Sequence, residues 1–407
     1  MKVAQPHLAL SDRQGLRALL FYTFLMVLGF TMLMPLVAVH FVSNVGMSSA
    51  TVGIALAVRQ LTQQGLTVAG GLLSDKLGAK PMICAGVLVR ALGFAALAWA
   101  GDPLLLILAL VISALGGALF EAPYQATIVA LTDDTNRRHY YLVSNWVSGI
   151  ASTIGPLIGI ALLQFDFQSV CYGAAACFFV NYLISLFFLP RVTTPGATQA
   201  PAANLKGVLH DRRFVFFTGL MGGYWFTSVQ VNISFPLWAE KLSGIQESVG
   251  IMYAVSAAIT VALQYPLVKL AERRFDTREI LTIGVVTMAL SLGAIGFVEQ
   301  FYAFLICVVF FTLGVLLTRP TQQTITAALA DGKSLGTYLG FSSLGLAVGG
   351  GLGNAIGGLL IDIAKTQQLL MLPWLVYCAV GLLSAAGLYW LTGTTASDKT
   401  NLLSQTQ

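Results

Sequence analysis

The sequence predicts an all-α membrane protein whose twelve transmembrane helices form two pseudo-symmetric six-helix bundles. Three observations predict this fold. Hydrophobic residues make up 57% of the 407 residues and charged residues only 10%, whereas soluble proteins carry about 25% charged residues. Long apolar segments recur along the chain, and its two halves resemble each other. This composition argues against a soluble enzyme, a nucleic-acid-binding protein and a disordered protein.

Twelve segments are long and apolar enough to cross a bilayer, whose hydrocarbon core requires roughly 20 helical residues. Helices are expected because backbone polar groups find no water partners in lipid. The first segment exceeds the apolar region of a signal peptide and lacks a small-residue cleavage site, so we expect it to be retained. The predicted spans are 17–41, 50–74, 81–101, 104–130, 140–164, 168–190, 214–239, 246–270, 279–298, 301–329, 336–362 and 370–393.

The positions of Lys and Arg predict the orientation. If the N-terminus is inside, cytoplasmic segments hold seventeen of the 22 basic residues and the outer loops hold two, Lys241 and Lys365. Basic residues favour cytoplasmic loops, and an even number of spans then places both termini in the cytoplasm. The remaining basic residues, Arg59, Arg90 and Arg319, fall within spans. We therefore expect a multi-pass membrane protein with this orientation.

The chain repeats at an offset of 197 residues. The fourth span contains GALFEAPYQATIVA from Gly117 and the tenth contains GVLLTRPTQQTITA from Gly314, and seven positions agree without a gap, Pro123 and Pro320 among them. Two six-helix halves in the same orientation form a parallel repeat, which places a binding site near the membrane midplane between them. The expected parts are an N-terminal bundle at 1–190, a cytoplasmic linker at 191–212, a C-terminal bundle at 213–393 and a cytoplasmic tail at 394–407.

The loop after the second span carries a recognisable motif. Its sequence, GLLSDKLGAK from Gly71 to Lys80, resembles the GxLxDxxGxK signature of the major facilitator superfamily. We expect a glycine turn here, and an Asp75 carboxylate that caps a helix N-terminus or pairs with a cation, so that it latches two helices together. The residues of this predicted conformational latch are Gly71, Asp75, Lys76, Gly78 and Lys80.

A second motif lies in the fifth span. Gly155-Pro156-Leu157-Ile158-Gly159 resembles the GPxxGG core of the antiporter signature in the drug:proton antiporter branch of this superfamily, with Ile160 in place of the last glycine. Small residues at this spacing allow close helix approach, and proline kinks a helix. We add Gly155, Pro156 and Gly159 to the predicted latch; the alternative is tight helix packing alone. The eleventh span has a similar glycine spacing at positions 349, 353, 357 and 358.

Further stretches along the whole chain resemble a proteobacterial multidrug-efflux branch of the superfamily, namely VGIALAVRQLTQQG, GAKPMICAG, LGGALFEAP and GTYLGFSSLGLAVGGGLG. The resemblance implies a secondary exporter of small amphipathic molecules in the bacterial inner membrane, driven by proton antiport with alternating access. One departure weakens the transfer of that mechanism, because Ser113 replaces the fourth-span arginine of the RxxxG pattern. Alternatives are an exporter of an anionic metabolite such as a carboxylate siderophore, and a membrane sensor or lipid-handling protein.

Glu121 is the one acid deep within a predicted span, and an ionisable residue at such depth is a functional candidate. It lies roughly 18 Å from the cytoplasmic end of its helix, and Arg90 lies roughly 15 Å in, at 1.5 Å per residue. Glu121 and Arg90 therefore form either a proton-coupling pair or a permanent structural ion pair. The offset of 197 aligns Glu121 with Thr318, one position before Arg319.

A polar stripe begins at Arg59 and continues through Gln63 and Thr67 at helical spacing. Such a stripe either lines a cavity or forms a hydrogen-bonded seam between helices. The resemblance implies that the first, fourth, seventh and tenth helices line a central cavity, and apolar walls with few polar groups suit drug-sized ligands. The predicted substrate-cavity residues are Arg319, Arg59, Gln63, Tyr22, Met26, Tyr124, Trp146, Tyr224, Trp225, Gln230, Asn232, Gln322 and Asn354.

Features of other chemistries are missing from the sequence. It contains no phosphate-binding Walker loop, no GxSxG nucleophile motif, and no CxxC or Cys/His cluster among its five cysteines. We therefore expect no enzymatic activity, no cofactor, no metal site and no nucleic-acid partner. The expected partners are a small-molecule substrate, the proton and the lipid bilayer, with the chain as a monomer.

Overall fold

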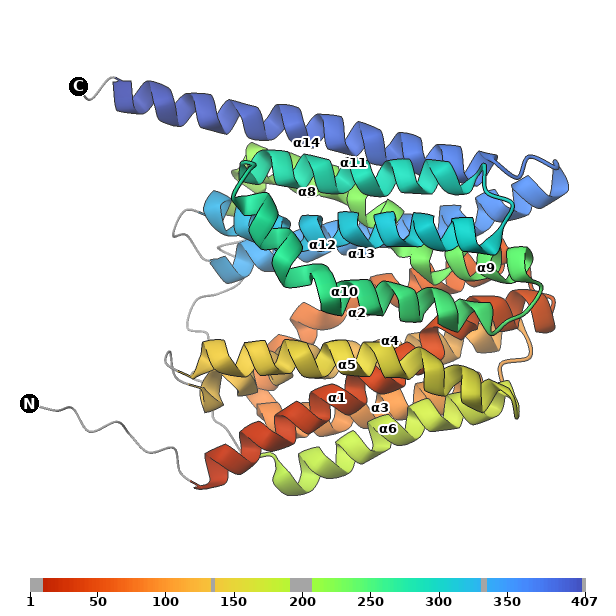
Figure 1. Cartoon of the computed structure of the whole chain (residues 1–407). Helices are drawn as coiled ribbons and strands as arrows, with labels where there is room; N and C mark the ends of the chain where they lie inside the picture. The colour runs from red at the N-terminus through yellow and green to blue at the C-terminus, as the bar shows by residue number, and fades with distance from the viewer. Residues whose placement is uncertain (1–9, 133–135, 191–206, 331–334, 405–407) are drawn as a thin grey trace, which may run out of the picture. The chain divides into compact units, whose positions relative to one another are not determined.

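The computed structural model describes residues 10–132, 136–190, 207–330 and 335–404, and these residues form helices joined by short turns, with no strand among them (Figure 1). The predicted all-α class is therefore confirmed. The helices of the first half are α1 (Leu10–Val39), which continues as the π-helical turn η1 (His40–Asn44), α2 (Ser49–Leu77), α3 (Ala79–Leu97), α4 (Pro103–Leu131), α5 (Arg137–Leu163) and α6 (Phe167–Phe188). Those of the second half are α8 (Arg212–Ser228), η2 (Val229–Asn232), α9 (Ser234–Ser243), α10 (Ser248–Glu272), α11 (Thr277–Ile295), α12 (Phe301–Ala330), α13 (Leu335–Thr366) and α14 (Leu372–Ser404).

Helix occupies all twelve predicted spans. Within the described residues, ten helices are long and apolar enough to cross a membrane. The other two spans depart from a simple apolar helix for visible reasons: α2 carries the polar stripe that begins at Arg59, and the seventh span is broken by the 3-10 turn η2 into α8 and α9.

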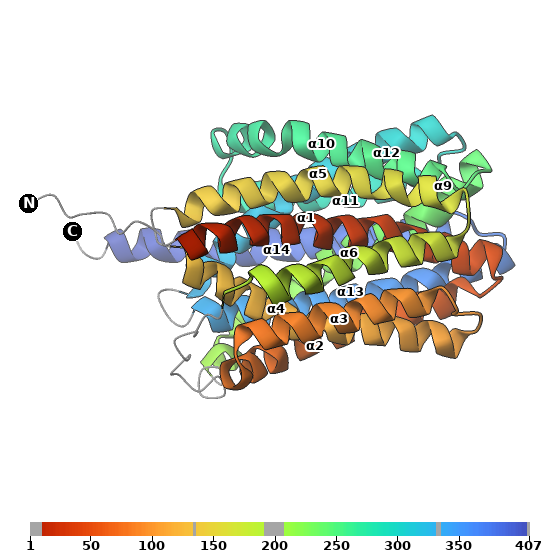
Figure 2. The ribbon, with the colours of Figure 1, turned by 90° about the horizontal axis from the view of Figure 1, so that it is seen from below.

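Contacts divide the chain into two units. The first contains Met1–Met34 and Thr62–Thr198, and the second contains Pro35–Leu61 and Gln199–Gln407. In the first unit α3 packs on α4 and α6, and in the second α11 packs on α12 and α14 (Figures 1 and 2). The end of α1 and the first part of α2 thus pack with C-terminal helices. The predicted division near residue 190 stays a prediction, and linker residues 191–206 lie outside the described part.

Equivalent glycine contacts join the central helix pair of each unit. A Cβ atom on Gly86 of α3 would lie 2.7 Å from the carbonyl oxygen of Gly116 on α4, and one on Gly314 of α12 would lie 2.6 Å from the carbonyl oxygen of Gly284 on α11. Only glycine permits such close backbone approach. The two helix pairs therefore cross in the same way, as expected for an internal repeat.

Turns and helix ends follow local sequence signals. Gly78, between α2 and α3, has a φ of 92°, a left-handed conformation that favours glycine, so the expected glycine turn is present. Asp166, between α5 and α6, accepts a hydrogen bond from the Ser169 N–H at 2.5 Å, and hydrogen bonds from the side chain and backbone of Ser169 lower its pKa. The last helix extends to Ser404, so most of the predicted tail continues α14.

Candidate functional site

Glu121 contacts a neighbouring helix through its carboxylate. It lies on α4, half-buried, and its Oε2 atom accepts a hydrogen bond from Gln63 Nε2 of α2 at 3.3 Å. At this point the polar stripe of α2 forms a hydrogen-bonded seam within the first unit. The carboxylate is thus held by a neutral donor.

Arg90, on α3, is 5% exposed and lies among aromatic rings. Its guanidinium carbon is 5.2–5.6 Å from the ring centroids of four phenylalanines, which are Phe30, Phe94, Phe120 and Phe178. Rings at this distance stabilise a cation by cation–π attraction. Within the described part of the chain, no ion pair joins Arg90 to Glu121, so the permanent ion pair considered from the sequence is not formed here.

Gly117 lies where Arg90 and Gln63 meet α4. A Cβ atom at Gly117 would be 2.8 Å from Arg90 Nη1 and 2.9 Å from Gln63 Cδ. The missing side chain therefore lets a guanidinium and an amide approach α4 one turn before Glu121.

Two predicted cavity tyrosines stack on each other inside the first unit. The rings of Tyr22 on α1 and Tyr124 on α4 have centroids 5.0 Å apart and an interplanar angle of 20°, and both are buried. The Tyr124 hydroxyl is hydrogen-bonded to Thr23 Oγ1. The two tyrosines hold α1 against α4, while Met26, one turn further along α1, is half-buried.

In the second unit the structure brings Arg319 and Trp225 together. Arg319 of α12 is exposed, and its guanidinium carbon is 5.8 Å from the ring centroid of Trp225 on α8. Tyr224, beside Trp225, is fully buried. The second unit therefore presents a cation on an indole face, and no ion pair to Arg319 is present among the described residues.

Glu121 and Arg319 occupy equivalent positions in the two helix pairs. A Cβ atom on Gly86 would meet Gly116 and Phe120 of α4, and one on Gly284 would meet Gly314 and Thr318 of α12. The spacing is the same in both helices, so Gly116 corresponds to Gly314. The structural offset is thus 198, one residue more than the offset of 197 read from matching residues. With this offset Arg319, not Thr318, aligns with Glu121 in the repeat.

Gln230, a predicted cavity residue in η2, is fully buried and its amide is saturated. Its Nε2 atom donates to the carbonyl oxygens of Phe226 and Gly353, both at 2.9 Å, and its Oε1 atom accepts from Ser234 Oγ at 2.7 Å. Gln230 therefore fastens the break in the seventh span to α13. Neighbouring Asn232 is half-buried.

The remaining predicted cavity residues lie on α2, α5, α12 and α13. Gln322 of α12 donates from Nε2 to Ser342 Oγ at 3.2 Å, and Arg59 of α2 is buried. Asn354 of α13 is also buried, with no hydrogen bond to its Oδ1 atom. Trp146 of α5 is 67% exposed. Within the first unit, the structure gathers Glu121, Gln63 and Arg90 into one cluster.

The predicted latch residues lie at two places in the first unit. Asp75 and Lys76 at the end of α2 are exposed, and Lys80 is half-buried; among the described residues Asp75 has no hydrogen-bond partner. On α5, a Cβ atom at Gly155 would collide with the side chain of Thr31 on α1. Gly155 therefore allows the close helix approach expected from its spacing.

Sequence reasoning missed Asp362, near the end of α13. Its Oδ1 atom accepts the N–H of Ser49 at 3.0 Å and its Oδ2 atom accepts the N–H of Ala50 at 2.7 Å. A carboxylate at a helix N-terminus satisfies unpaired N–H groups and interacts favourably with the helix dipole. Gly358, one turn earlier on the same face, packs against Ser49, and the glycine spacing that leads to Asp362 is the signal that could have found it.

A second missed cluster joins η1 to α9 within the second unit. Ser43 Oγ donates to Glu240 Oε2 at 2.5 Å. Gln246 Nε2 donates to Glu240 Oε1 at 3.2 Å and to Asn44 Oδ1 at 2.5 Å. The end of α1 is therefore tied to the end of α9 by side chains whose pairing sequence alone did not indicate.

Known proteins resemble this chain in sequence. The sequence matches the profile of the Major Facilitator Superfamily over residues 19–274 and 225–406. It is 40% identical over 372 residues to the multidrug resistance protein MdtH of Yersinia pestis (strain Pestoides F), covering 91% of this chain and 93% of that protein. MdtH of Yersinia pseudotuberculosis serotype O:1b shows the same identity and coverage.

Solved structures share the fold. A peptide transporter POT in complex with sulfate has a TM-score of 0.78 at 14% identity, covering 94% of each chain. The nucleoside transporter NupG has a TM-score of 0.75 at 13% identity, covering 94% of this chain and 99% of that one. At such low identity the likeness concerns the fold alone.

Proposed function

The chain belongs to the major facilitator superfamily, and from that premise we propose that it exports small amphipathic molecules in exchange for protons by alternating access. It is a multi-pass protein of the inner membrane. We place both termini in the cytoplasm, because the basic residues concentrate on that side. The observation that supports the proposal is the half-buried Glu121 carboxylate, which accepts a hydrogen bond from Gln63. Its position in the repeat corresponds to that of Arg319.

Glu121 suits proton coupling for an electrostatic reason. A carboxylate within a membrane span is costly in its charged form, and the hydrogen bond that Glu121 accepts comes from the neutral amide of Gln63. Uptake of a proton removes the charge and alters the bond to α2. In this scheme Arg90 acts as a fixed positive charge nearby, stabilised by its phenylalanine rings.

Asp362 forms a contact between two helices that could distinguish the two access states. Its two hydrogen bonds hold the start of α2 against α13, and the mutual approach of Gly358 and Ser49 keeps the backbones close. These contacts form in one conformation and would break when α2 separates from α13. We propose that Asp362 latches one of the two access states, alongside the predicted loop latch at Asp75.

A direct test of the proposed function uses the full chain in proteoliposomes with ethidium as the transported cation. A pH gradient should drive ethidium against its own gradient, in the direction opposite to proton flow, and a protonophore should abolish this accumulation. Movement of ethidium at the same rate with and without the protonophore would contradict proton antiport.

A second candidate function is export of an anionic metabolite, favoured by the exposed Arg319 over Trp225. The same vesicles loaded with labelled citrate test it. Transport of citrate that is lost in Arg319→Gln, together with no transport of ethidium, would select this candidate over the first.

Gly117→Ala is expected to reduce proton-coupled transport about tenfold without unfolding the chain. The added methyl group would press on Arg90 Nη1 and Gln63 Cδ, and such overpacking costs about 1–3 kcal/mol. Initial rates in proteoliposomes measure the effect. Gly65→Ala on α2 is the matched control, because a Cβ atom there meets no atom within 4 Å, and equal rates for both variants would refute the role of the cluster.

A further inference from the structure

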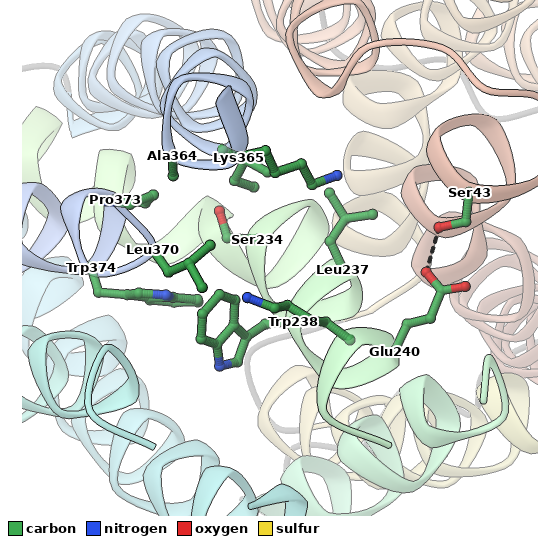
Figure 3. A pocket seen from close by; sticks show the side chains of 12 residues that line it. Ser43, Ser234, Leu237, Trp238, Glu240, Ala364, Lys365, Leu370, Pro373 and Trp374 are labelled. Carbon is green, nitrogen blue, oxygen red and sulfur yellow. Dashed lines mark hydrogen bonds between the residues drawn. The ribbon is translucent and has the colours of Figure 1, made fainter. Parts of the chain in front are cut away.

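A cavity of about 520 Å³ lies in the second unit, bounded by η1, α9, α13 and the start of α14 (Figure 3). Much of its wall is apolar, with Leu237, Ile361 and Leu370 among the lining residues. Figure 3 shows Trp374 on one side of the pocket and the hydrogen-bonded pair Ser43 and Glu240 on the other. This pocket contains none of the residues assigned to transport above.

The pocket carries positive charge that no acid in the described part of the chain neutralises. Lys241 and Lys365 line it, and neither forms an ion pair among the residues described. The acid in its wall, Glu240, already accepts hydrogen bonds on both oxygens, from Ser43 and Gln246. Burial, and secondly the neighbouring Lys365, lower the pKa of Lys241. Two like charges in a partly apolar pocket are costly, and an incoming anion would relieve that cost.

The same pocket has indole N–H groups without acceptors. Trp374 is 2% exposed, and its Nε1 atom has no hydrogen-bond partner; the Nε1 atom of Trp238 also lacks one. The two rings pack edge to face with centroids 5.3 Å apart, and Lys241 Nζ lies 4.3 Å from the Trp238 centroid. Buried indole N–H groups are usually hydrogen-bonded. The pocket is therefore rich in donors and cations and poor in available acceptors.

We propose that this pocket binds an anionic amphiphile. An acidic head group would lie near Lys241 and Lys365 and accept hydrogen bonds from the indole groups, and an alkyl chain would lie against Leu237 and Leu370. The chemistry is that of a phospholipid with a net negative head group or of a free amphiphilic acid. An apolar chain accounts for the leucine and tryptophan walls, which a small inorganic anion would leave unused.

Tryptophan quenching tests this proposal on the full-length protein. Trp99, Trp146, Trp225 and Trp390 are replaced by Phe, so that fluorescence reports on Trp238 and Trp374. The probes are phosphatidylglycerol and phosphatidylcholine with brominated acyl chains, and 11-bromoundecanoate with the neutral 11-bromoundecanol. We expect an anionic probe to quench at a concentration at least tenfold lower than its uncharged or zwitterionic counterpart.

The pattern across probes identifies the source of the ligand. Preferential quenching by phosphatidylglycerol alone indicates a lipid, and quenching by bromoundecanoate indicates a free acid. Replacing both Lys241 and Lys365 by Gln should remove the preference, while Arg at both positions should retain it. Lys269→Gln is the matched control, since Lys269 Nζ lies over the Tyr265 ring, 5.3 Å from its centroid, elsewhere in this unit. Equal quenching by charged and uncharged probes, or a preference that survives both Gln substitutions, would overturn the proposal.

Discussion

Glu121→Gln is expected to abolish the response of transport to a pH gradient. Glutamine keeps the size of the side chain and can still accept a hydrogen bond from Gln63, which donates to Glu121 at 3.3 Å in the structure. It cannot take up or release a proton. Protonation changes the charge of Glu121, and glutamine stays uncharged at every pH. The variant should therefore still carry substrate down a concentration gradient, but it should no longer accumulate substrate against that gradient.

The measurement is ethidium flux in proteoliposomes with and without an imposed pH gradient. Glu121→Asp is the informative control, because it retains a carboxylate at the position equivalent to Arg319 and should preserve part of the response. Glu299→Gln removes an exposed acid in the turn before α12 and should leave the response unchanged. A Glu121→Gln variant that still accumulates ethidium at the wild-type level would eliminate Glu121 as the coupling residue.

Asp362→Ala is expected to shift the conformational equilibrium by about tenfold or more. The substitution removes the acceptor of two backbone N–H groups at 3.0 and 2.7 Å, and hydrogen bonds to a charged group contribute about 1.5–3 kcal/mol each. A change of about 1.4 kcal/mol alters a two-state population tenfold. The contact between α2 and α13 should therefore open more often.

Ser49→Cys reports this opening, because Ser49 is fully buried and cysteine is close to serine in size. In a chain without its native cysteines, we expect maleimide to modify the Ser49→Cys thiol about tenfold faster when Asp362 is Ala. Asp362→Asn keeps one acceptor oxygen and should give an intermediate rate. Identical rates for all three side chains at position 362 would show that the contact does not limit opening.

The sequence predicted the fold well because the bilayer imposes simple requirements. Helix length and apolarity located the spans. They located even α2, because apolar residues surround the polar stripe of this helix. The glycine turn at Gly78 was also predictable, since its conformation is local. Helix boundaries were less predictable. Nothing in the sequence after residue 393 required α14 to end, and the helix continues to Ser404.

The partners of individual side chains were harder to predict, because they depend on helix crossing. Matching residues such as Pro123 and Pro320 gave an offset of 197. The structural offset of 198 depends instead on contacts with Gly86 of α3 and Gly284 of α11. Gln230 was predicted to line the cavity, and in the structure its amide donates to Phe226 within the broken span and to Gly353 of α13. The aromatic surroundings of Arg90 come from α1, α3, α4 and α6, and no single stretch of sequence contains that arrangement.

The boundary between the two units has a mechanical consequence. Both α1 and α2 begin in one unit and end in the other, so any displacement between the units must be absorbed by bending these two helices. In α1 the boundary falls between Met34 and Pro35, where the proline lacks an N–H group and interrupts the hydrogen-bond ladder. In α2 it falls between Leu61 and Thr62, four residues before Gly65. We therefore expect α1 and α2 to bend at these two places if the units move.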